Sequence, residues 1–308
     1  MTDLRFRRTA PSADDARAAL RTVRDLLRWA TGRMRAAGVA FGHGTDDAWD
    51  EAAWLVLWSL HLPPDRLEPV LDARLAPAEI AAAVALVERR CTERLPAAYL
   101  TGEAWLRGVR FLSDPRALVP RSPIAELIDG DALDPWLPAD GPAHVMDLCT
   151  GGASLAILAA LRWPDTAVVG TDLSADALAL AAENVALHGL EARVSLRRGS
   201  LWAPVAGERF DLVVCNPPYV NAASMAALPA EYLHEPQGAL GGGDDGMDLV
   251  RDIVAGARGH LAPGGVLVLE IGHEAAHFEA AFAGLEFGWL PVESGDDRIV
   301  LLERDALP

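Results

Sequence analysis

The chain has 308 residues and a formal net charge of −17 at pH 7. A composition of 51% hydrophobic and 23% charged residues is that of a globular protein and excludes wholesale disorder, collagen and a small disulfide scaffold. No apolar run reaches the roughly 18 residues that a membrane helix needs, and the charged N-terminus lacks the apolar core of a secretory signal. We therefore expect a cytoplasmic protein with no membrane partner.

The charge also limits the classes of partner. All 27 basic residues are arginine. An acidic chain repels a nucleic-acid backbone unless its basic residues gather on one face, and it attracts basic proteins. We expect a basic protein partner and no direct sequence-specific binding of nucleic acid. The cysteines form no CxxC pair, which argues against a metal cluster.

The first third of the chain has helical periodicity. Over residues 16–94, Ala, Leu, Trp and Val recur at three- and four-residue spacing, which predicts a helical domain over residues 1–98. Alternation around residues 109–112 predicts a short hairpin, and three prolines follow it. Residues 99–123 are therefore predicted to be a hairpin and connector.

The remainder, residues 124–308, alternates strand and helix patterns. We expect strands at residues 144–149, 167–171, 194–197, 210–215, 266–271, 288–292 and 298–302, and helices at residues 154–162, 175–188, 246–261 and 274–283. This order predicts an α/β domain with a mainly parallel, doubly wound sheet that binds ligands at the carboxyl ends of its strands. The last two strands have no helix between them, which predicts one antiparallel strand.

The first motif that could bind a ligand is a small-residue turn. Residues 145–149 form an apolar strand that runs into Thr150-Gly151-Gly152 and then a helix, so backbone can approach a ligand closely. Asp172 closes the next strand, where a carboxylate can accept hydrogen bonds from a ribose diol. The spacing is not the G-x-G-x-x-G of nicotinamide sites. The pair alone indicates an adenosine-containing cofactor, with a tight turn and a helix-capping Asp as the alternative.

The second motif, Asn216-Pro217-Pro218-Tyr219, directly follows the strand at residues 210–215. Tandem prolines set two φ angles near −65° and remove two donors, which leaves backbone carbonyls without intramolecular partners. Asn216 adds a side-chain acceptor and Tyr219 a flat aromatic face. The motif therefore suits the –NH2 group of a planar amide or an aromatic amine.

A third pattern, His273-Glu274-Ala275-Ala276-His277, matches the H-E-x-x-H zinc motif. No histidine follows His277 to act as a third ligand. We predict a surface helix with two histidines at this position, and no metal site.

Together, the turn, Asp172 and the NPPY motif resemble those of class I S-adenosylmethionine-dependent methyltransferases. Pro120-Arg121 and the segment from Glu235-Pro236 to Asp245-Gly246 narrow the resemblance to the protein-glutamine N5-methyltransferases, the HemK/Prm family. Two segments, residues 120–124 and 41–51, are most similar to the members that modify ribosomal protein L-three; release-factor enzymes have a PRPDT-like sequence in place of the first. The resemblance extends over about residues 21–302.

The resemblance implies a Rossmann-like, mainly parallel seven-stranded sheet preceded by an all-helical substrate-recognition domain. It implies methyl transfer from S-adenosyl-L-methionine, with S-adenosyl-L-homocysteine as product, to the side-chain amide nitrogen (N5) of a glutamine in L-three. The substrate is then the free protein or a ribosome assembly intermediate. Three alternatives stay open: a release-factor glutamine methyltransferase, a nucleic-acid N6-amine methyltransferase and a non-catalytic ribosome-assembly factor.

The resemblance also assigns roles to residues. Catalysis falls to Asn216, Pro217 and Tyr219. The cofactor-binding set is Asp147, Cys149, Thr150, Gly151, Gly152, Ala153, Asp172, Ser200, Leu201 and Asn216. The substrate-binding set is Arg121, Asn216, Pro217, Pro218, Tyr219 and Glu235.

Two of these residues depart from the family pattern. Ala153 replaces the last glycine of D-L-x-T-G-S/T-G, and we expect its methyl to crowd the methionine end of the cofactor unless φ stays negative there. Ser200 stands where relatives often have an acidic residue that contacts the adenine amine. A serine can accept that hydrogen bond without charge assistance.

Overall fold

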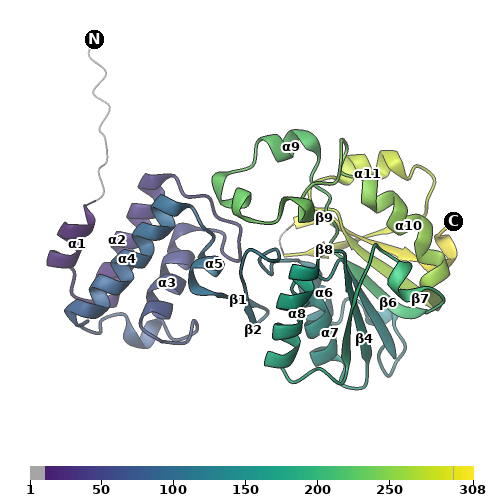
Figure 1. Cartoon of the computed structure of the whole chain (residues 1–308), viewed down its shortest axis with the longest axis horizontal. Helices are drawn as coiled ribbons and strands as arrows, with labels where there is room; N and C mark the ends of the chain where they lie inside the picture. Colours follow the sequence, from purple (N-terminus) through teal and green to yellow (C-terminus); the bar gives the residue numbers. More distant parts are fainter. Residues whose placement is uncertain (1–10, 294) are drawn as a thin grey trace, which may run out of the picture. The chain divides into compact units, whose positions relative to one another are not determined.

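A computed structural model of the chain describes residues 11–293 and 295–308. The chain divides into two compact units (Figure 1). The first comprises Met1–Gly102 together with Pro229–His234, and the second comprises Glu103–Leu228 and Glu235–Pro308. The segment Pro229–His234 is therefore distant in sequence from the rest of its unit. The charged N-terminus considered above lies largely outside the described residues.

The first unit is helical. Its helices are α1 (Ala13–Ala19), α2 (Val23–Ala37), α3 (Ala48–Ser59), α4 (Pro77–Glu93) and α5 (Ala97–Thr101), with short 3-10 helices η1 (Glu68–Val70) and η4 (Ala230–His234). Thr22 caps α2 through a capping box with Asp25, and Gly38 ends that helix in the left-handed region. The apolar face of α2, including the fully buried Leu27 and Met34, packs in one core with residues of α3 and α4.

A buried ionic cluster lies inside this helical unit. Arg90 of α4 donates from Nε to Glu51 Oε1 at 2.7 Å and from Nη1 to Glu231 Oε1 at 3.3 Å, and all three side chains are fully buried. Arg90 also donates to the carbonyl of Ala40, and the Ala40 N–H donates to Glu231. Burial raises the pKa of the Glu51 carboxyl, and Arg90 opposes that effect. Through Glu231, the cluster holds the segment Pro229–His234 in the helical unit.

The second unit contains a seven-stranded sheet of order β5-β4-β3-β6-β7-β9-β8 and a separate hairpin. The hairpin pairs β1 (Glu103–Leu106) with β2 (Val109–Leu112). The sheet strands are β3 (His144–Leu148), β4 (Ala167–Asp172), β5 (Val194–Arg198), β6 (Phe210–Cys215), β7 (Leu261–Glu270), β8 (Gly288–Val292) and β9 (Gly295–Glu303). All pairs are parallel except those of β9, which runs antiparallel between β7 and β8. The predicted sheet with one antiparallel strand is confirmed.

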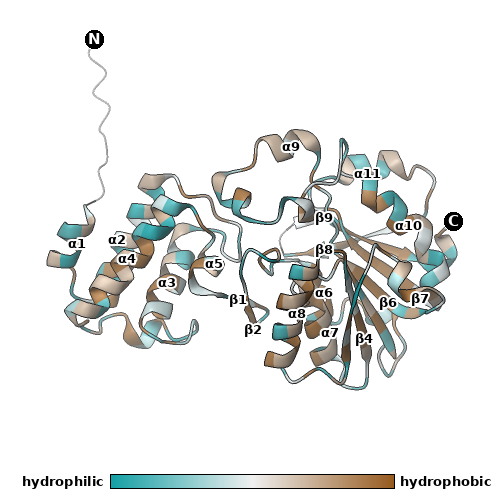
Figure 2. Cartoon of the chain, viewed as in Figure 1, coloured by the Kyte–Doolittle hydropathy of each residue, from teal (hydrophilic) through white to brown (hydrophobic). Residues whose placement is uncertain are grey.

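Helices cover both faces of this sheet. They are α6 (Ile124–Asp129), α7 (Ser154–Arg162), α8 (Ala175–Leu187), α10 (Asp248–His260) and α11 (Ala275–Ala281). The unit also contains α9 (Ala222–Ala226), which has no buried residue, and the 3-10 helices η2 (Asp134–Trp136), η3 (Ala203–Val205), η5 (Gln237–Ala239) and η6 (Arg304–Ala306). Side chains alternate along each strand: Leu212 joins the core under α6, α7 and α8, whereas Val213 joins the core under α10 and α11. Figure 2 shows the central strands as predominantly hydrophobic, which is typical of a sheet buried on both sides.

Several element limits differ from those expected. Residues 99–101 end helix α5, so the hairpin begins only at Glu103. Strand β7 begins at Leu261, five residues early, because Phe210 pairs with Leu261 before an irregularity in the ladder. Helices α6 and α9 were not predicted because both are too short for a periodic pattern. Among the described helices, none combines the length and apolarity required to cross a membrane.

The buried cluster predicts an asymmetric response to two neighbouring substitutions. Arg90→Met leaves Glu51 buried without its cation and leaves Glu231 with Arg94 alone, and we expect the helical unit to lose about 3–5 kcal/mol of unfolding free energy. Arg89→Met is the control, since Arg89 is half-exposed and pairs with Glu93 on the surface. Urea unfolding of the full chain measures both variants, and equal losses would contradict the prediction.

Candidate functional site

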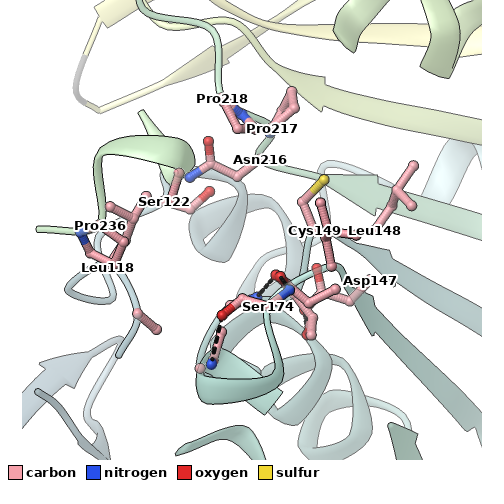
Figure 3. Close-up of a pocket in the computed structure, with 18 of the residues that line it drawn as sticks. Leu118, Ser122, Asp147, Leu148, Cys149, Ser174, Asn216, Pro217, Pro218 and Pro236 are labelled. Atoms are coloured by element: carbon pink, nitrogen blue, oxygen red, sulfur yellow. Dashed lines mark hydrogen bonds between the residues drawn. The ribbon is translucent and has the colours of Figure 1, made fainter. Parts of the chain in front are cut away.

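The second unit has a cavity of about 460 Å³ at the carboxyl ends of its central strands. Residues that follow β3, β4, β5 and β6 line it, together with the segment 116–122 and parts of 236–240. Figure 3 shows Asn216, Pro217 and Pro218 on one side of the view and Ser174 and Asp147 on the other. The volume is within the range of sites that enclose a cofactor or small ligand.

Of the predicted site residues, most line this cavity. They are Arg121, Asp147, Cys149, Thr150, Gly151, Gly152, Asp172, Ser200, Leu201, Asn216, Pro217, Pro218 and Tyr219. Ala153 and Glu235 are absent from the described residues of its lining. Motifs separated by up to about 100 residues in sequence therefore converge on one pocket.

Asp147 stabilises the small-residue turn through hydrogen bonds of its buried carboxylate. Its Oδ2 accepts hydrogen bonds from the Thr150 hydroxyl at 2.6 Å and from the Ala156 N–H at 3.0 Å. Burial raises the pKa of the Asp147 carboxyl to about 7, against the lowering effect of these two bonds. The residue is 1% exposed, so its main structural effect is to join the turn to helix α7.

Asp172 connects the turn to the next strand. One carboxylate oxygen accepts from the Gly151 N–H at 2.9 Å, and the other accepts from the Ser174 N–H at 2.8 Å. Each carboxylate oxygen has a second lone pair, which a hydroxyl of a ligand can occupy. Beside it, Thr171 lines the pocket, and its Oγ1 is buried without a hydrogen-bond partner among the described residues.

The structure corrects the expectation for Ala153. Its φ is +64°, in the left-handed region, but its side chain is fully buried in the core under α7. The cost of alanine is therefore backbone strain at the start of that helix, and not a methyl group in the pocket. Two pocket residues, Cys149 and Leu201, also have positive φ values. Cys149 and Ala153 therefore place two strained residues at the ends of the same turn.

The NPPY motif follows β6, and its hydrogen-bond acceptors have no donor within the described part of the chain. Among the described residues, nothing donates a hydrogen bond to the Asn216 side chain or to the Pro217 carbonyl. In Figure 3 the Asn216 amide points toward the side of the pocket that Ser122 lines. Two oxygen acceptors at one turn are the arrangement predicted for binding an –NH2 group.

Tyr219 is held more firmly than its sequence context indicated. Its hydroxyl donates to Glu270 Oε1 at 2.8 Å. A Cβ atom at Gly272 would lie 2.5 Å from its ring, so the chain passes directly against the aromatic ring. Burial and the neighbouring Glu270 raise the pKa of Tyr219 well above its ordinary value, which keeps the phenol protonated.

The glycine-rich loop after Glu235 packs against the backbone of the same turn. A Cβ at Gly242 would lie 2.8 Å from the Pro218 carbonyl oxygen, and one at Gly246 would lie 2.1 Å from that of Tyr219. Val220 exchanges backbone hydrogen bonds with this loop, donating to Leu240 and accepting from Gly242. Glycine is required here because any side chain would collide with the motif's main chain.

Arg121 and Glu235, both predicted to bind substrate, bind each other. Two parallel hydrogen bonds of 2.5 and 2.8 Å join them, and Glu235 also accepts from the Val119 N–H. Arg121 lines the pocket, whereas the Glu235 side chain is fully buried. Such a bidentate pair fixes the wall segment 118–122 in place.

The H-E-x-x-H pattern has a structural role. Glu274 is 2% exposed and accepts a hydrogen bond from Asn221 Nδ2 at 2.6 Å. Asn221 is two residues after Tyr219 in the sequence, so this bond lies next to the NPPY turn. His277 Nδ1 lies 2.5 Å from the other Glu274 oxygen. Helix α11 begins at Ala275, so the predicted helix carries His277 but not His273, which precedes it. The described residues contain no group of His, Cys, Asp and Glu arranged to bind a metal ion.

Sequence reasoning assigned no individual role to three residues that organise the site. Glu270 lines the pocket at the end of β7, and Ser122 donates to it. Asn184 of α8 donates to the Gly152 carbonyl and exchanges hydrogen bonds with Leu112 at the end of the hairpin. A signal existed for Glu270, since it is the one charged residue in the apolar run 266–271.

Comparison with known proteins decides the family. A family model for the methyltransferase small domain matches residues 131–282. The ribosomal protein uL3 glutamine methyltransferase of Bordetella pertussis is 58% identical over 94% of this chain and 97% of that protein. The chain belongs to the ribosomal protein uL3 glutamine methyltransferase family.

Other relatives agree with this membership. Proteins of the same description from Neisseria gonorrhoeae and Xanthomonas campestris pv. campestris are 48% and 47% identical. The matches cover 94% and 96% of this chain, and 96% and 94% of those proteins, respectively. The predicted family and methyltransferase fold are confirmed, and matches of this coverage include most of the helical unit.

The close contact between Gly242 and the backbone of the NPPY turn predicts that Gly242→Ala destabilises the protein. The new methyl would meet three backbone atoms within 2.8 Å, so we expect a loss of about 1–3 kcal/mol and a lower thermal midpoint. Gly259→Ala is the control, because nothing lies within 4 Å of its Cβ position in helix α10. That variant should be as stable as the parent or slightly more stable. Equal midpoints for the two variants would contradict this close approach.

Asp147 predicts a pH-dependent difference in stability. Its pKa is about 7 in the folded protein and near 4 when unfolded, so ionisation disfavours folding as pH rises through that interval. Asp147→Asn keeps an oxygen for both hydrogen bonds and removes the charge. Relative to the parent, we expect the variant to gain up to roughly 4 kcal/mol between pH 4 and pH 8. Urea unfolding at both pH values measures the change, and a constant difference would argue against the raised pKa.

Proposed function

We propose that the chain transfers a methyl group from S-adenosyl-L-methionine to the side-chain amide nitrogen of a glutamine in ribosomal protein uL3. The observation that carries the proposal is the NPPY turn, whose Asn216 side chain and Pro217 carbonyl are available as acceptors inside the pocket. Family membership supports the same substrate.

The pocket suits the cofactor. Asp172 is proposed to bind the ribose hydroxyls, and the Gly151-Gly152 turn to admit the methionine portion. Thr171 Oγ1, buried without a partner among the described residues, would gain one from a polar ligand. Cys149, Thr150, Ser200 and Leu201 complete the proposed cofactor-binding wall, with Asp147 behind it. When bound, S-adenosyl-L-methionine supplies an electrophilic methyl group and leaves as S-adenosyl-L-homocysteine.

The chain's own groups prepare the acceptor. An amide nitrogen is a poor nucleophile because its lone pair is delocalised into the carbonyl. Asn216 Oδ1 and the Pro217 carbonyl oxygen would each accept one N–H, which favours positive charge on the nitrogen and sets its direction. Such orientation and electrostatic preorganisation lower a barrier by several kcal/mol. Tyr219 and Pro218 form the wall against the amide, and the excess proton leaves after transfer.

The two units have separate proposed roles. Residues 124–308 bind the cofactor and carry the chemistry, and the helical unit recognises the protein substrate. All of the chain's excess negative charge arises from residues 103–308, because residues 1–102 contain as many arginines as acidic residues. An acidic catalytic unit attracts a basic ribosomal protein and accelerates its association. A ribosomal substrate implies that the reaction takes place in the cytoplasm.

The first experiment offers two substrates in parallel. Purified enzyme and labelled S-adenosyl-L-methionine are incubated with unmethylated uL3 or with an unmethylated release factor, and mass spectrometry locates the added methyl. We expect label on one glutamine of uL3 and none on the release factor. Label on the release factor alone would overturn the substrate, and label on neither would overturn the activity.

Asn216→Ala separates chemistry from cofactor binding. Without Oδ1, the acceptor amide loses one of its two hydrogen bonds and its orientation, so we expect kcat on uL3 to fall at least ~100-fold. Calorimetric affinity for S-adenosyl-L-methionine should change less than about threefold, because Asp172 and the glycine turn remain. Turnover close to that of the parent would remove Asn216 from the mechanism.

A further inference from the structure

Glu270 is a buried carboxylate to which the proposed mechanism assigns no part. It is the last residue of β7 and 5% exposed, yet it lines the pocket. Cys215 of β6 pairs with Leu269 of β7, so Asn216 and Glu270 each follow that pair at the same edge of the sheet. The acceptor motif and this carboxyl group therefore leave adjacent parallel strands together.

Both oxygens of Glu270 are engaged by the pocket wall. Oε1 accepts from the Tyr219 hydroxyl at 2.8 Å, and Oε2 accepts from the Ser122 hydroxyl at 2.5 Å. Ser122 belongs to the connector before α6, and Tyr219 belongs to the NPPY turn. One side chain thus joins two segments that are about 100 residues apart in sequence and that both line the pocket.

The surroundings of Glu270 leave its charge without a close cation. Charged or titratable groups face it from each neighbouring segment: Tyr219 from the turn, Cys215 from β6, Arg121 from the connector and Arg298 from β9. Among the described residues, none forms an ion pair with it within 4 Å, and Arg121 is bound to Glu235. Burial raises the pKa of Glu270, while its hydrogen bonds and the two arginines oppose that effect.

We propose that Glu270 is a positioning residue for the glutamine end of the pocket. Its two oxygens hold Tyr219 and Ser122 in one arrangement, and its ionised form places negative charge beside the amide nitrogen that gains positive charge during transfer. The proposal rests on the proposed function for its substrate. It predicts that kcat depends on the ionisation of Glu270, although this residue needs no contact with the transferred methyl group.

Glu270→Gln tests the charge while keeping the shape. Glutamine can still accept from Tyr219, so we expect the fold and the KM for S-adenosyl-L-methionine to be retained within about threefold. We expect kcat on uL3 at pH 8 to fall at least ~10-fold. The parent's kcat should rise with pH as Glu270 ionises. This rise, the acid limb of the kcat–pH profile, should be absent from the variant. An unchanged kcat with the same acid limb would overturn the proposal.

A double-mutant cycle tests whether the two hydroxyls act through Glu270. Ser122→Ala and Tyr219→Phe should each lower kcat in the parent and have little further effect in a Glu270→Ala background, where neither hydroxyl has its acceptor. Additive effects in both backgrounds would overturn the proposal. Ser113→Ala is the matched control, because Ser113 is also buried but its Oγ has no hydrogen-bond partner among the described residues.

Two further readouts cover the remaining cases. If Glu270→Gln does not fold, Tyr219→Phe alone serves as the test, because it removes one hydrogen bond that lowers the Glu270 pKa. The rise of kcat with pH should then move to higher pH, and an unmoved rise would count against the proposal.

If the parent methylates no glutamine, the proposed function fails, and unfolding free energies still test Glu270. Since its folded pKa is raised, the parent should lose stability relative to Glu270→Gln as pH rises above about 4. A pH-independent difference would overturn the ionisable role.

Discussion

The site depends on one constraint: the turn that carries Asn216 cannot hold itself in place. Pro217 and Pro218 have no N–H to donate, so the turn lacks the local hydrogen bonds that stabilise ordinary turns. Its position is set from outside by the backbone of Gly242 and Gly246 and by the Tyr219–Glu270 hydrogen bond. The same lack of local bonding keeps the Pro217 carbonyl available for a ligand.

Two buried carboxylates precede the loop that supports this turn. Glu231 joins the ionic cluster of the helical unit through Arg90, and four positions later Glu235 forms its bidentate pair with Arg121 in the pocket wall. Both acids are removed from water, so either would be costly without its arginine.

The sequence predicted the succession of strands and helices along the chain, the mainly parallel sheet with one antiparallel strand and the convergence of the two main motifs, because hydrophobic period and strand–helix alternation determine those features. It could not predict which side chains face the ligand. Ala153 and Glu235 lie within motifs but point into protein, whereas Glu270 lies outside every motif and lines the pocket. Side-chain direction near a strand end depends on long-range packing, as in the contact between Gly272 and the Tyr219 ring.

The charges around the pocket connect its construction to its chemistry. Both arginines in its described lining are neutralised by carboxylates, Arg116 by Asp114 and Glu183, and Arg121 by Glu235. Asp172 and Glu270 accept hydrogen bonds but have no ion-pair partner within 4 Å among the described residues. The surplus in the pocket is therefore negative, and a low-dielectric wall strengthens its effect on a cation. A reaction in which positive charge moves from a sulfonium group to an amide nitrogen is favoured in such surroundings throughout the transfer, without a side chain acting as a strong base.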